Sequence, residues 1–348
     1  MKFKKIKLTK KQIIIIAIIL VILITGIIVA VVLLNHKETP VIKKKTKTET
    51  VEKVNIVDVE SNSRPYAVMI NNINVARTVQ SGLNKAYIVY EMIVEGGITR
   101  YLALFRDADV AKIGSIRSAR HYYLDYVMEN DAIFIHWGYS PQALEDMSFY
   151  GIDRITDNMN YFYRDTSLNV ASEHTLFTTS DMLDQAVEDK GMRSTTDTGL
   201  LLDYSAKSID FSKYGTTTDA TKVDLTYSNY ISDSYVYNEE TKTYDRSVNG
   251  TAQIDQNDGK QISVKNIIVY QVENHTISGD EKGRQELSNI GSGKGYLISE
   301  GKAISINWYK PYRDTRTEYT FDNGEKIKVN DGNTFIQIVP TAGNVSME

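Results

Sequence analysis

The sequence predicts a protein of mixed α/β and α+β class, with an N-terminal transmembrane helix, an α/β domain built on a mixed sheet, and a mostly-β C-terminal domain. Three features lead to this prediction: an uncharged apolar run at 13–34, short apolar stretches that alternate with helix-start signals between 63 and 203, and the loss of those signals from 204 to 348. A chain of 348 residues is long enough for two modest domains and these additional segments.

The apolar run at 13–34 reads IIIIAIILVILITGIIVAVVLL and contains no charged residue. As a helix rising about 1.5 Å per residue, it would cross a hydrocarbon layer of about 30 Å. A cleaved signal peptide is the alternative, but its apolar part usually covers only about 7 to 15 residues and ends at small side chains. Lysines flank the run on both sides, so their count does not set the orientation. The short tail at 1–12 and the large acidic body favour a cytoplasmic tail and an extracytoplasmic body.

Charge and cysteine content narrow the classes of function. Residues 1–47 contain eleven lysines and one acidic residue, which leaves 29 basic against 43 acidic side chains in the rest of the chain. A body this acidic repels polyanions, so nucleic acid is not an expected partner. The chain has no cysteine, which excludes disulfides, thiolate metal sites and a lipid-modified N-terminal cysteine. Residues 35–62 are rich in Lys, Thr, Glu and Val and are predicted to be a linker.

Residues 63–203 show the pattern of an α/β domain. Six short apolar runs are predicted to be strands: PYAVMI (65–70), AYIVYEMIV (86–94), TRYLALF (99–105), KIGSI (112–116), AIFIHW (132–137) and TLFTT (175–179). Helix-start signals follow several of them, with Ser118, Ser140 and Ser180 as predicted N-caps and Pro141 at a first helical position. Gly96 and Gly97 are predicted to turn one strand back on the next, which makes the sheet mixed.

Residues 204–348 are predicted to form a β domain. Tyr, Thr, Ser, Asp and Asn dominate this part of the chain. Two hairpins are predicted, one at YVYNEETKTYDR (235–246) and one with an Asn-Gly turn at YTFDNGEKIKV (319–329). The GSGKG stretch at 291–295 lacks the spacing of a phosphate-binding loop, and we expect it to be a hairpin loop instead.

A group of polar residues is predicted to meet at one edge of the α/β sheet. Ligands of open α/β sheets bind where strands end and the next helices begin. The candidate ligand-binding residues at such ends are Glu91, Glu95, Arg100, Arg117, Ser118, Arg120, His136, Ser140 and His174. We expect Arg117 and Arg120 to lie in the first turn of a helix, where guanidinium groups and free backbone N–H groups receive an anion. Glu91 and Glu95, four residues apart on one strand, would share a face and orient the arginines.

Two other interpretations of these residues stay open. Arginines and glutamates on neighbouring strands also form purely structural ion-pair networks. His136 and His174 lack the spacing of a zinc site, so we expect hydrogen-bonded histidines, no metal site and no bound cofactor.

Several segments together resemble the YerB-like lipoprotein family of Gram-positive bacteria. The resemblance covers nearly all of residues 63–342. It rests on RPYAVMINN (64–72), EGGITR (95–100), IRSAR (116–120), DAIFIHWGYSPQA (131–143), EHTLFTT (173–179), KNIIVYQV (265–272), IGSGKGYLISEGKAISINWYK (290–310) and DGNTFIQIVP (331–340). It implies an exported, membrane-held, two-domain protein without an assigned activity. This chain departs from the family by a transmembrane segment in place of the lipid-bearing cysteine and by Tyr87 where Asp is common.

We therefore expect a membrane-anchored, extracytoplasmic cell-envelope protein whose sheet edge binds an anionic or sugar-peptide ligand, a cell-wall fragment or precursor. Its partners would be the membrane, through 13–34, and a cell-wall component or envelope protein. One alternative is an envelope transferase or hydrolase acting on a phosphate-linked substrate, with Glu95 as base and a divalent cation as cofactor. The arrangement of a membrane anchor, an α/β body and clustered arginines is similar in outline to that of the LytR-CpsA-Psr phosphotransferases. The other alternative is a non-catalytic protein whose β domain docks a partner. Whether the protein is an enzyme stays open.

Overall fold

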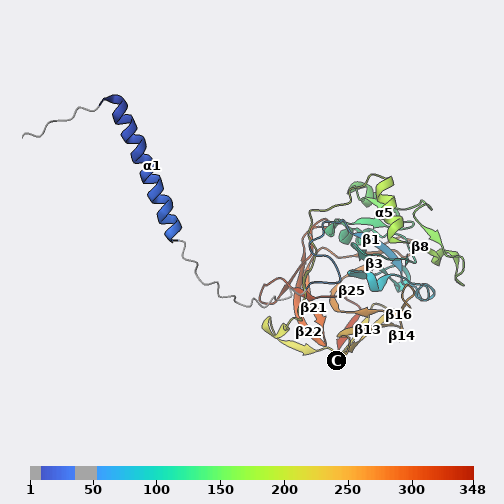
Figure 1. Ribbon diagram of the computed structural model, residues 1–348. Coiled ribbons are helices and arrows are strands. Elements are labelled where there is room, and N and C mark those ends of the chain that lie inside the picture. Colours follow the sequence, from blue (N-terminus) through green and yellow to red (C-terminus); the bar gives the residue numbers. More distant parts are fainter. Residues whose placement is uncertain (1–8, 36–52) are drawn as a thin grey trace, which may run out of the picture. The chain divides into compact units, whose positions relative to one another are not determined.

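The computed structural model describes residues 9–35 and 53–348. The chain separates into two compact units, Met1–Val51 and Glu52–Glu348. The helix α1, Lys10–Asn35, covers the apolar run of the first unit (Figure 1). Within residues 9–35 and 53–348, no helix combines the length and the hydropathy that a membrane crossing requires. Residues 1–8 of the predicted tail and most of the predicted linker lie outside the described residues, whereas 10–12, predicted as tail, belong to α1.

The second unit is built on a mixed sheet of eleven strands. Its strands are, in spatial order, β10 (Thr217–Asp219), β22 (Lys302–Lys310), β21 (Gly291–Ser299), β18 (Asn266–Val272), β25 (Thr334–Pro340), β2 (Ile88–Ile93), β3 (Thr99–Phe105), β1 (Tyr66–Asn71), β5 (Ile133–Ile135) and β6 (Arg154–Ile155), with β23 (Glu318–Phe321) paired to β22. The central strands β2, β3 and β25 are buried along their whole length. Apolar residues predominate in these strands because both faces of the sheet are covered.

Both halves of the chain contribute to this sheet. Strand β2, from the predicted α/β domain, pairs in parallel with β25, from the predicted β domain. On its other side β2 pairs with β3 in antiparallel fashion, and β3 pairs in the same way with β1. The sheet is therefore mixed, as predicted, but it runs without a break through an α/β part and a mostly-β part. The sequence gives no signal for this pairing, because β2 and β25 are some 240 residues apart.

A second sheet of six strands belongs to the C-terminal half. Its strands are β14 (Thr251–Ala252), β13 (Thr243–Val248), β12 (Ser232–Asn238), β11 (Lys222–Thr226) and β26 (Asn344–Met347), with β17 (Ser263–Val264) paired to β13. The smaller sheets are β15 (Ile254–Asp255) with β16 (Lys260–Gln261), β19 (Asn274–Thr276) with β20 (Gln285–Leu287), β24 (Lys328–Asn330) with β9 (Asp203–Ser205), and β4 (Ile113–Gly114) with β8 (Leu176–Thr178) and β7 (Tyr163–Arg164).

Of the two predicted hairpins, the first is present as predicted and the second is not. The β12–β13 hairpin is confirmed, with Asn238 opposite Thr243. At the Asn-Gly turn, β23 makes only a single bridge to the returning chain, and β24 pairs with β9 instead.

The helices of the second unit are short. They are α2 (Asn74–Arg77), α3 (Leu124–Glu129), α4 (Pro141–Phe149) and α5 (Ser180–Asp189), with 3-10 turns η1 (Leu83–Lys85), η2 (Glu95–Gly97), η3 (His121–Tyr123), η4 (Ser172–His174) and η5 (Phe211–Lys213). Ser140 caps α4, as predicted, by accepting a hydrogen bond from the backbone of Ala143. The cap of α5 is Thr179 rather than Ser180. In Figure 1, α5 lies at the end of this unit that carries β1 and β8, away from β13 and β14.

The predicted linker extends too far into the globular unit. Val54 and Val57, placed in the linker by composition, are buried in the core. The backbone N–H groups of Asn55 and Ile56 donate to the carboxylate of Asp331. The two buried valines and these hydrogen bonds attach residues 53–57 to the second unit, although the segment shows no helical or strand periodicity.

The GSGKG stretch at 291–295 is part of strand β21 and not the predicted hairpin loop. Gly293 lies opposite Trp308, and an added Cβ would come 2.8 Å from the indole nitrogen. Gly295 lies opposite Tyr270, and a Cβ there would come 2.5 Å from the carbonyl oxygen of Val269. The glycines are needed because neighbouring side chains and backbone approach the strand closely.

We predict that Gly295→Ala lowers the free energy of unfolding by about 1 to 3 kcal/mol, because the new methyl group collides with a backbone atom that a side-chain movement cannot clear. Urea unfolding of the full-length protein measures this loss. Gly199→Ala is the matched control, since no atom lies within 4 Å of its Cβ position. Equal stability of the two variants would contradict the prediction.

Candidate functional site

The carboxyl edge of the N-terminal part of the sheet is shaped by a gap between two parallel strands. Strands β1 and β5 pair only as far as Val68 and Ile135. Beyond that point a loop enters between them: the N–H of Arg117 donates to the carbonyl of Met69 at 2.9 Å, and the N–H of Trp137 donates to the carbonyl of Arg117 at 3.0 Å. Open α/β sheets bind ligands at this edge, and here the segment 115–119 occupies the gap between the strands and brings its side chains to the edge.

Arg100, Arg120 and Glu95 form one cluster at this edge. Glu95 receives two hydrogen bonds from Arg120, from Nε and, at 2.9 Å, from Nη2. Arg100, 6% exposed, lies 3.6 Å from the same carboxylate and donates to the carbonyl of Ser118 at 2.6 Å. Burial opposes ionisation of Glu95, but the hydrogen bond and charge of Arg120 and the charge of Arg100 outweigh it and hold its pKa below the usual value. Burial and the charge of Arg120 lower the pKa of Arg100 to about 10.

Arg117 and His174 form a second cluster. Arg117 approaches Glu173 only loosely, at 3.6 Å from its carboxylate and 3.4 Å from its carbonyl. The carboxylate of Glu173 is 59% exposed, so water competes for this ion pair. His174 is buried between Glu173, at 3.2 Å from Nε2, and the amide of Asn71, at 3.0 Å from Nδ1. Burial is the main cause that lowers the pKa of His174.

The remaining residues of the predicted edge have local contacts. His136 is fully buried, and its Nδ1 lies 2.9 Å from the carbonyl of Gly138. Burial lowers the pKa of His136 to about 4, so the ring is neutral at pH 7. In the neutral ring Nδ1 donates to that carbonyl, which leaves Nε2 as an acceptor. Ser140 is occupied as the cap of α4, and Ser118 contributes its carbonyl to Arg100.

The helix expected to begin after Ser118 does not carry the arginines. The chain is extended at Arg120, with φ −126° and ψ 145°, and the first helical residue is His121. Arg117 and Arg120 therefore lie on extended backbone, and the predicted anion site at a helix N-terminus is wrong. The backbone N–H groups of this segment instead hold the sheet edge together: that of Ala119 donates to Gly138. Sequence reasoning missed this because Ser-Ala-Arg-His is compatible with a helix start.

Several buried polar atoms at this edge have no partner. Among residues 9–35 and 53–348, nine buried side-chain nitrogen or oxygen atoms lack a hydrogen bond. Five belong to this edge: Arg100 Nε, Ser115 Oγ, Arg117 Nε, His136 Nε2 and Thr156 Oγ1. Leaving a buried polar group unpaired costs free energy, so such a concentration calls for bound water or a ligand. The charges at this edge do not cancel. Three arginines, Arg100, Arg117 and Arg120, stand against two carboxylates, Glu95 and Glu173, which leaves a net charge of one positive unit.

Glu91 does not join this edge, which corrects the sequence prediction. Strand β2 ends at Ile93, so the alternation of faces along the strand does not reach Glu95 in η2. Glu91 lies opposite Tyr101, whereas Arg100 lies opposite Met92, so Glu91 and Arg100 point to opposite faces of the sheet. Glu91 is fully buried and pairs with Arg246 at 2.7 Å.

Arg246 is the centre of a buried ionic cluster. Its guanidinium also pairs with Asp233 at 2.6 Å, and all three side chains have no exposed surface. Asn72 and Thr99 donate to the free oxygen of Glu91 at 3.0 and 2.6 Å. Burial and the charge of Asp233 raise the pKa of Glu91 to about 8, because one arginine faces two carboxylates. No motif marks Asp233 and Arg246. The available signal is strand alternation, which places them on the same face as the apolar or aromatic Tyr235, Tyr244 and Val248.

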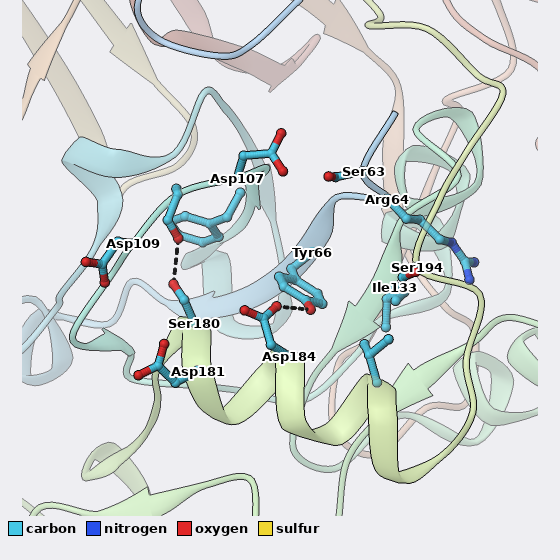
Figure 2. Close-up of a pocket in the computed structure, with 13 residues that line it drawn as sticks. Ser63, Arg64, Tyr66, Asp107, Asp109, Ile133, Ser180, Asp181, Asp184 and Ser194 are labelled. Carbon is cyan, nitrogen blue, oxygen red and sulfur yellow. Dashed lines mark hydrogen bonds between the residues drawn. The ribbon is translucent and has the colours of Figure 1, made fainter. Parts of the chain in front are cut away.

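A group of four aspartates lines a different cavity of about 340 Å³ beside α5 (Figure 2). Asp107, Asp109, Asp181 and Asp184 line it, and the hydroxyl of Tyr66 donates to Asp184 at 2.6 Å. None of the nine predicted residues lines this cavity. It is acidic and therefore unsuited to the anionic ligand expected at the sheet edge.

We predict that the buried cluster makes stability depend on pH. The folded-state pKa of Glu91, about 8, lies above its usual 4.5. The contribution of Glu91 is therefore fully present below pH 4.5 and is lost as the pH rises to about 8, with a slope of at most about 1.4 kcal/mol per pH unit. Urea unfolding at a series of pH values should show this slope in the wild type and a flatter profile in Glu91→Gln. The exposed Glu240→Gln serves as control, and an unchanged profile in Glu91→Gln would refute the assignment.

Comparison with known proteins is consistent with this architecture. Residues 54–193 match the N-terminal domain, and residues 223–336 the C-terminal domain, of a family described as protein of unknown function DUF3048. The putative lipoprotein YerB of Bacillus subtilis strain 168 is 32% identical over 291 residues, which are 80% of this chain and 81% of that protein. The crystal structure of YerB from Bacillus subtilis superposes with a TM-score of 0.71 at 29% identity, covering 84% of this chain and 99% of that one. This chain belongs to the DUF3048 family of YerB-like proteins, as the sequence resemblance predicted.

Proposed function

We propose that this protein is an envelope protein held at the membrane by residues 13–34, whose sheet edge binds an anionic cell-wall fragment or precursor. The charge-free run of the sequence supports the anchor, and the name of the Bacillus subtilis relative, a lipoprotein, supports a membrane-held envelope location. On this proposal the body is extracytoplasmic, with the membrane through 13–34 and a cell-wall component or envelope protein as its partners.

The observation that carries the ligand site is the group of buried polar atoms without partners. Arg100 Nε and Arg117 Nε are donors that an anion would satisfy, and His136 Nε2 is an acceptor that a ligand hydroxyl would satisfy. The surplus of one positive charge favours a single negative charge on the ligand. A carboxylate or a phosphodiester next to a sugar hydroxyl meets all of these requirements.

The residues of the edge would have different roles. Arg117 is the principal anion-binding residue, because its contacts to Glu173 are long and a ligand can replace them. Arg100, which is more deeply buried, would support it with a second guanidinium. Arg120 is committed to Glu95 by two hydrogen bonds and would position Arg100 rather than contact the ligand. His174 would hold Asn71 in place.

Binding without turnover is the better-supported form of this proposal. Glu95 is the candidate base of the enzymatic alternative, but two arginines hold its pKa below the usual value. A carboxylate whose pKa is lowered accepts a proton less readily at pH 7.

We predict that Arg117→Gln weakens binding of the full-length, detergent-solubilised protein to purified peptidoglycan by about tenfold or more, the size expected when a charge-assisted hydrogen bond is lost. Co-sedimentation at increasing peptidoglycan concentration measures this change. The melting temperature should stay within a few degrees, because the lost ion pair is loose and exposed.

Arg193→Gln is the matched control, since it removes an arginine that is half exposed and lies with Asp131, outside the edge. Wild-type protein that does not sediment with peptidoglycan would contradict the proposed ligand. Arg117→Gln that binds like the wild type would contradict the proposed site. A large fall in its melting temperature would favour a structural ion-pair network.

A further inference from the structure

A separate cavity of about 290 Å³ lies between α2 and the strands β14 and β15. It is small for a ligand pocket, so it suits a single ring or a short chain end. The polar residues that line it are Asn74, Arg77, Thr78, Thr251, Gln253 and Gln256. They come from both halves of the chain, which explains why no stretch of sequence indicates them.

Arg77 is the one charged residue among those that line this cavity. Within the described part of the chain, Arg77 has no ion pair with a carboxylate. It donates through Nη1 to the carbonyl of Asn72 at 2.7 Å and through Nη2 to the side chain of Asn74 at 3.0 Å. A guanidinium has five N–H donors, so three remain for a ligand. Burial is the main cause that lowers the pKa of Arg77, and a bound anion would offset that cost.

The floor of the cavity is rigid. Gln253 is 2% exposed, and its oxygen accepts a hydrogen bond from Arg246. Its nitrogen donates to Gln80 at 2.5 Å and to the hydroxyl of Tyr101 at 3.1 Å. These contacts hold the side chain in one orientation. Preorganised polar groups of this kind give specificity at little entropic cost.

We propose that this cavity binds a small hydroxyl-bearing carboxylate, an acidic sugar of the uronic-acid type, with the carboxylate on Arg77. One guanidinium matches one carboxylate, in the two-pronged geometry that arginine favours. The hydroxyls of Thr78 and Thr251 and the amide of Gln256 both donate and accept, as sugar hydroxyls require. A phosphate dianion would leave a negative charge uncompensated, because no second cation lines the cavity. This site is distinct from the sheet edge, where Arg117 lies.

Isothermal titration of the full-length, detergent-solubilised protein with glucuronate tests the proposal. For so small a ligand we expect a dissociation constant of about 1 mM. Arg77→Gln should weaken binding at least about tenfold, because it removes the charge that faces the carboxylate. Gln256→Ala keeps that charge and should weaken binding several-fold, which covers the case that Arg77→Gln fails to fold.

Arg154→Gln is the matched control, a partly buried arginine outside the cavity. It should leave glucuronate binding unchanged. Peptidoglycan co-sedimentation reports on the edge site separately, so failure here is distinguishable from failure of that site. Glucose and acetate are the control ligands, and both should bind more weakly than glucuronate. Absence of wild-type binding, acetate binding as tight as that of glucuronate, or wild-type affinity in both Arg77→Gln and Gln256→Ala would overturn the proposal.

Discussion

The ion pairs of Arg246 with Glu91 and Asp233 link the eleven-stranded sheet to the six-stranded sheet. Glu91 stands on the main sheet, Arg246 and Asp233 on the six-stranded sheet, and water reaches none of them. Such a cluster adds little to the net free energy of unfolding, since the cost of desolvating the charges offsets much of their attraction. The cluster nevertheless constrains how the two sheets pack. Removing one partner of a buried ion pair leaves an uncompensated charge and lowers the free energy of unfolding by about 3 to 5 kcal/mol. The pairing therefore favours the relative position of the two sheets in which the one guanidinium reaches both carboxylates.

The pleat of strands β2 and β3 separates this cluster from the candidate ligand site. Glu91 and Tyr101 face the second sheet, whereas the neighbouring pair, Met92 and Arg100, faces the opposite side. One face of the strands thus carries the buried structural charges, and the other supplies a guanidinium to an edge with free donors and acceptors. The cavity beside Arg77 borders the cluster, since its floor residue Gln253 also contacts Arg246. The two faces of the main sheet therefore differ chemically: one carries the buried cluster around Glu91, and the other carries Arg100 at the candidate ligand site.

Local sequence patterns predicted much of the fold. Apolar runs marked β1, β2 and β3, the double glycine marked the turn between β2 and β3, and Ser140 with Pro141 marked the start of α4. Glu95, Arg100 and Arg120 form one cluster at this edge, and Arg117 and His174 form another. The errors arose where the local signal was ambiguous: Ser118 resembles a helix cap, but the chain there is drawn into extended pairing with the sheet. Glu91 was misplaced because strand alternation was extended past the end of β2.

The sequence by itself determined the element types, the family, the two-part organisation and the presence of arginines near strand ends, because these depend on short-range periodicity and on motifs. Only the tertiary structure decided that β25 joins β2, that Arg246 pairs with Glu91, and that Arg77 and Gln253 line one cavity. Each of these depends on contacts between residues more than 150 positions apart. Such contacts arise when buried surfaces and charges are satisfied together, and no local pattern records that balance.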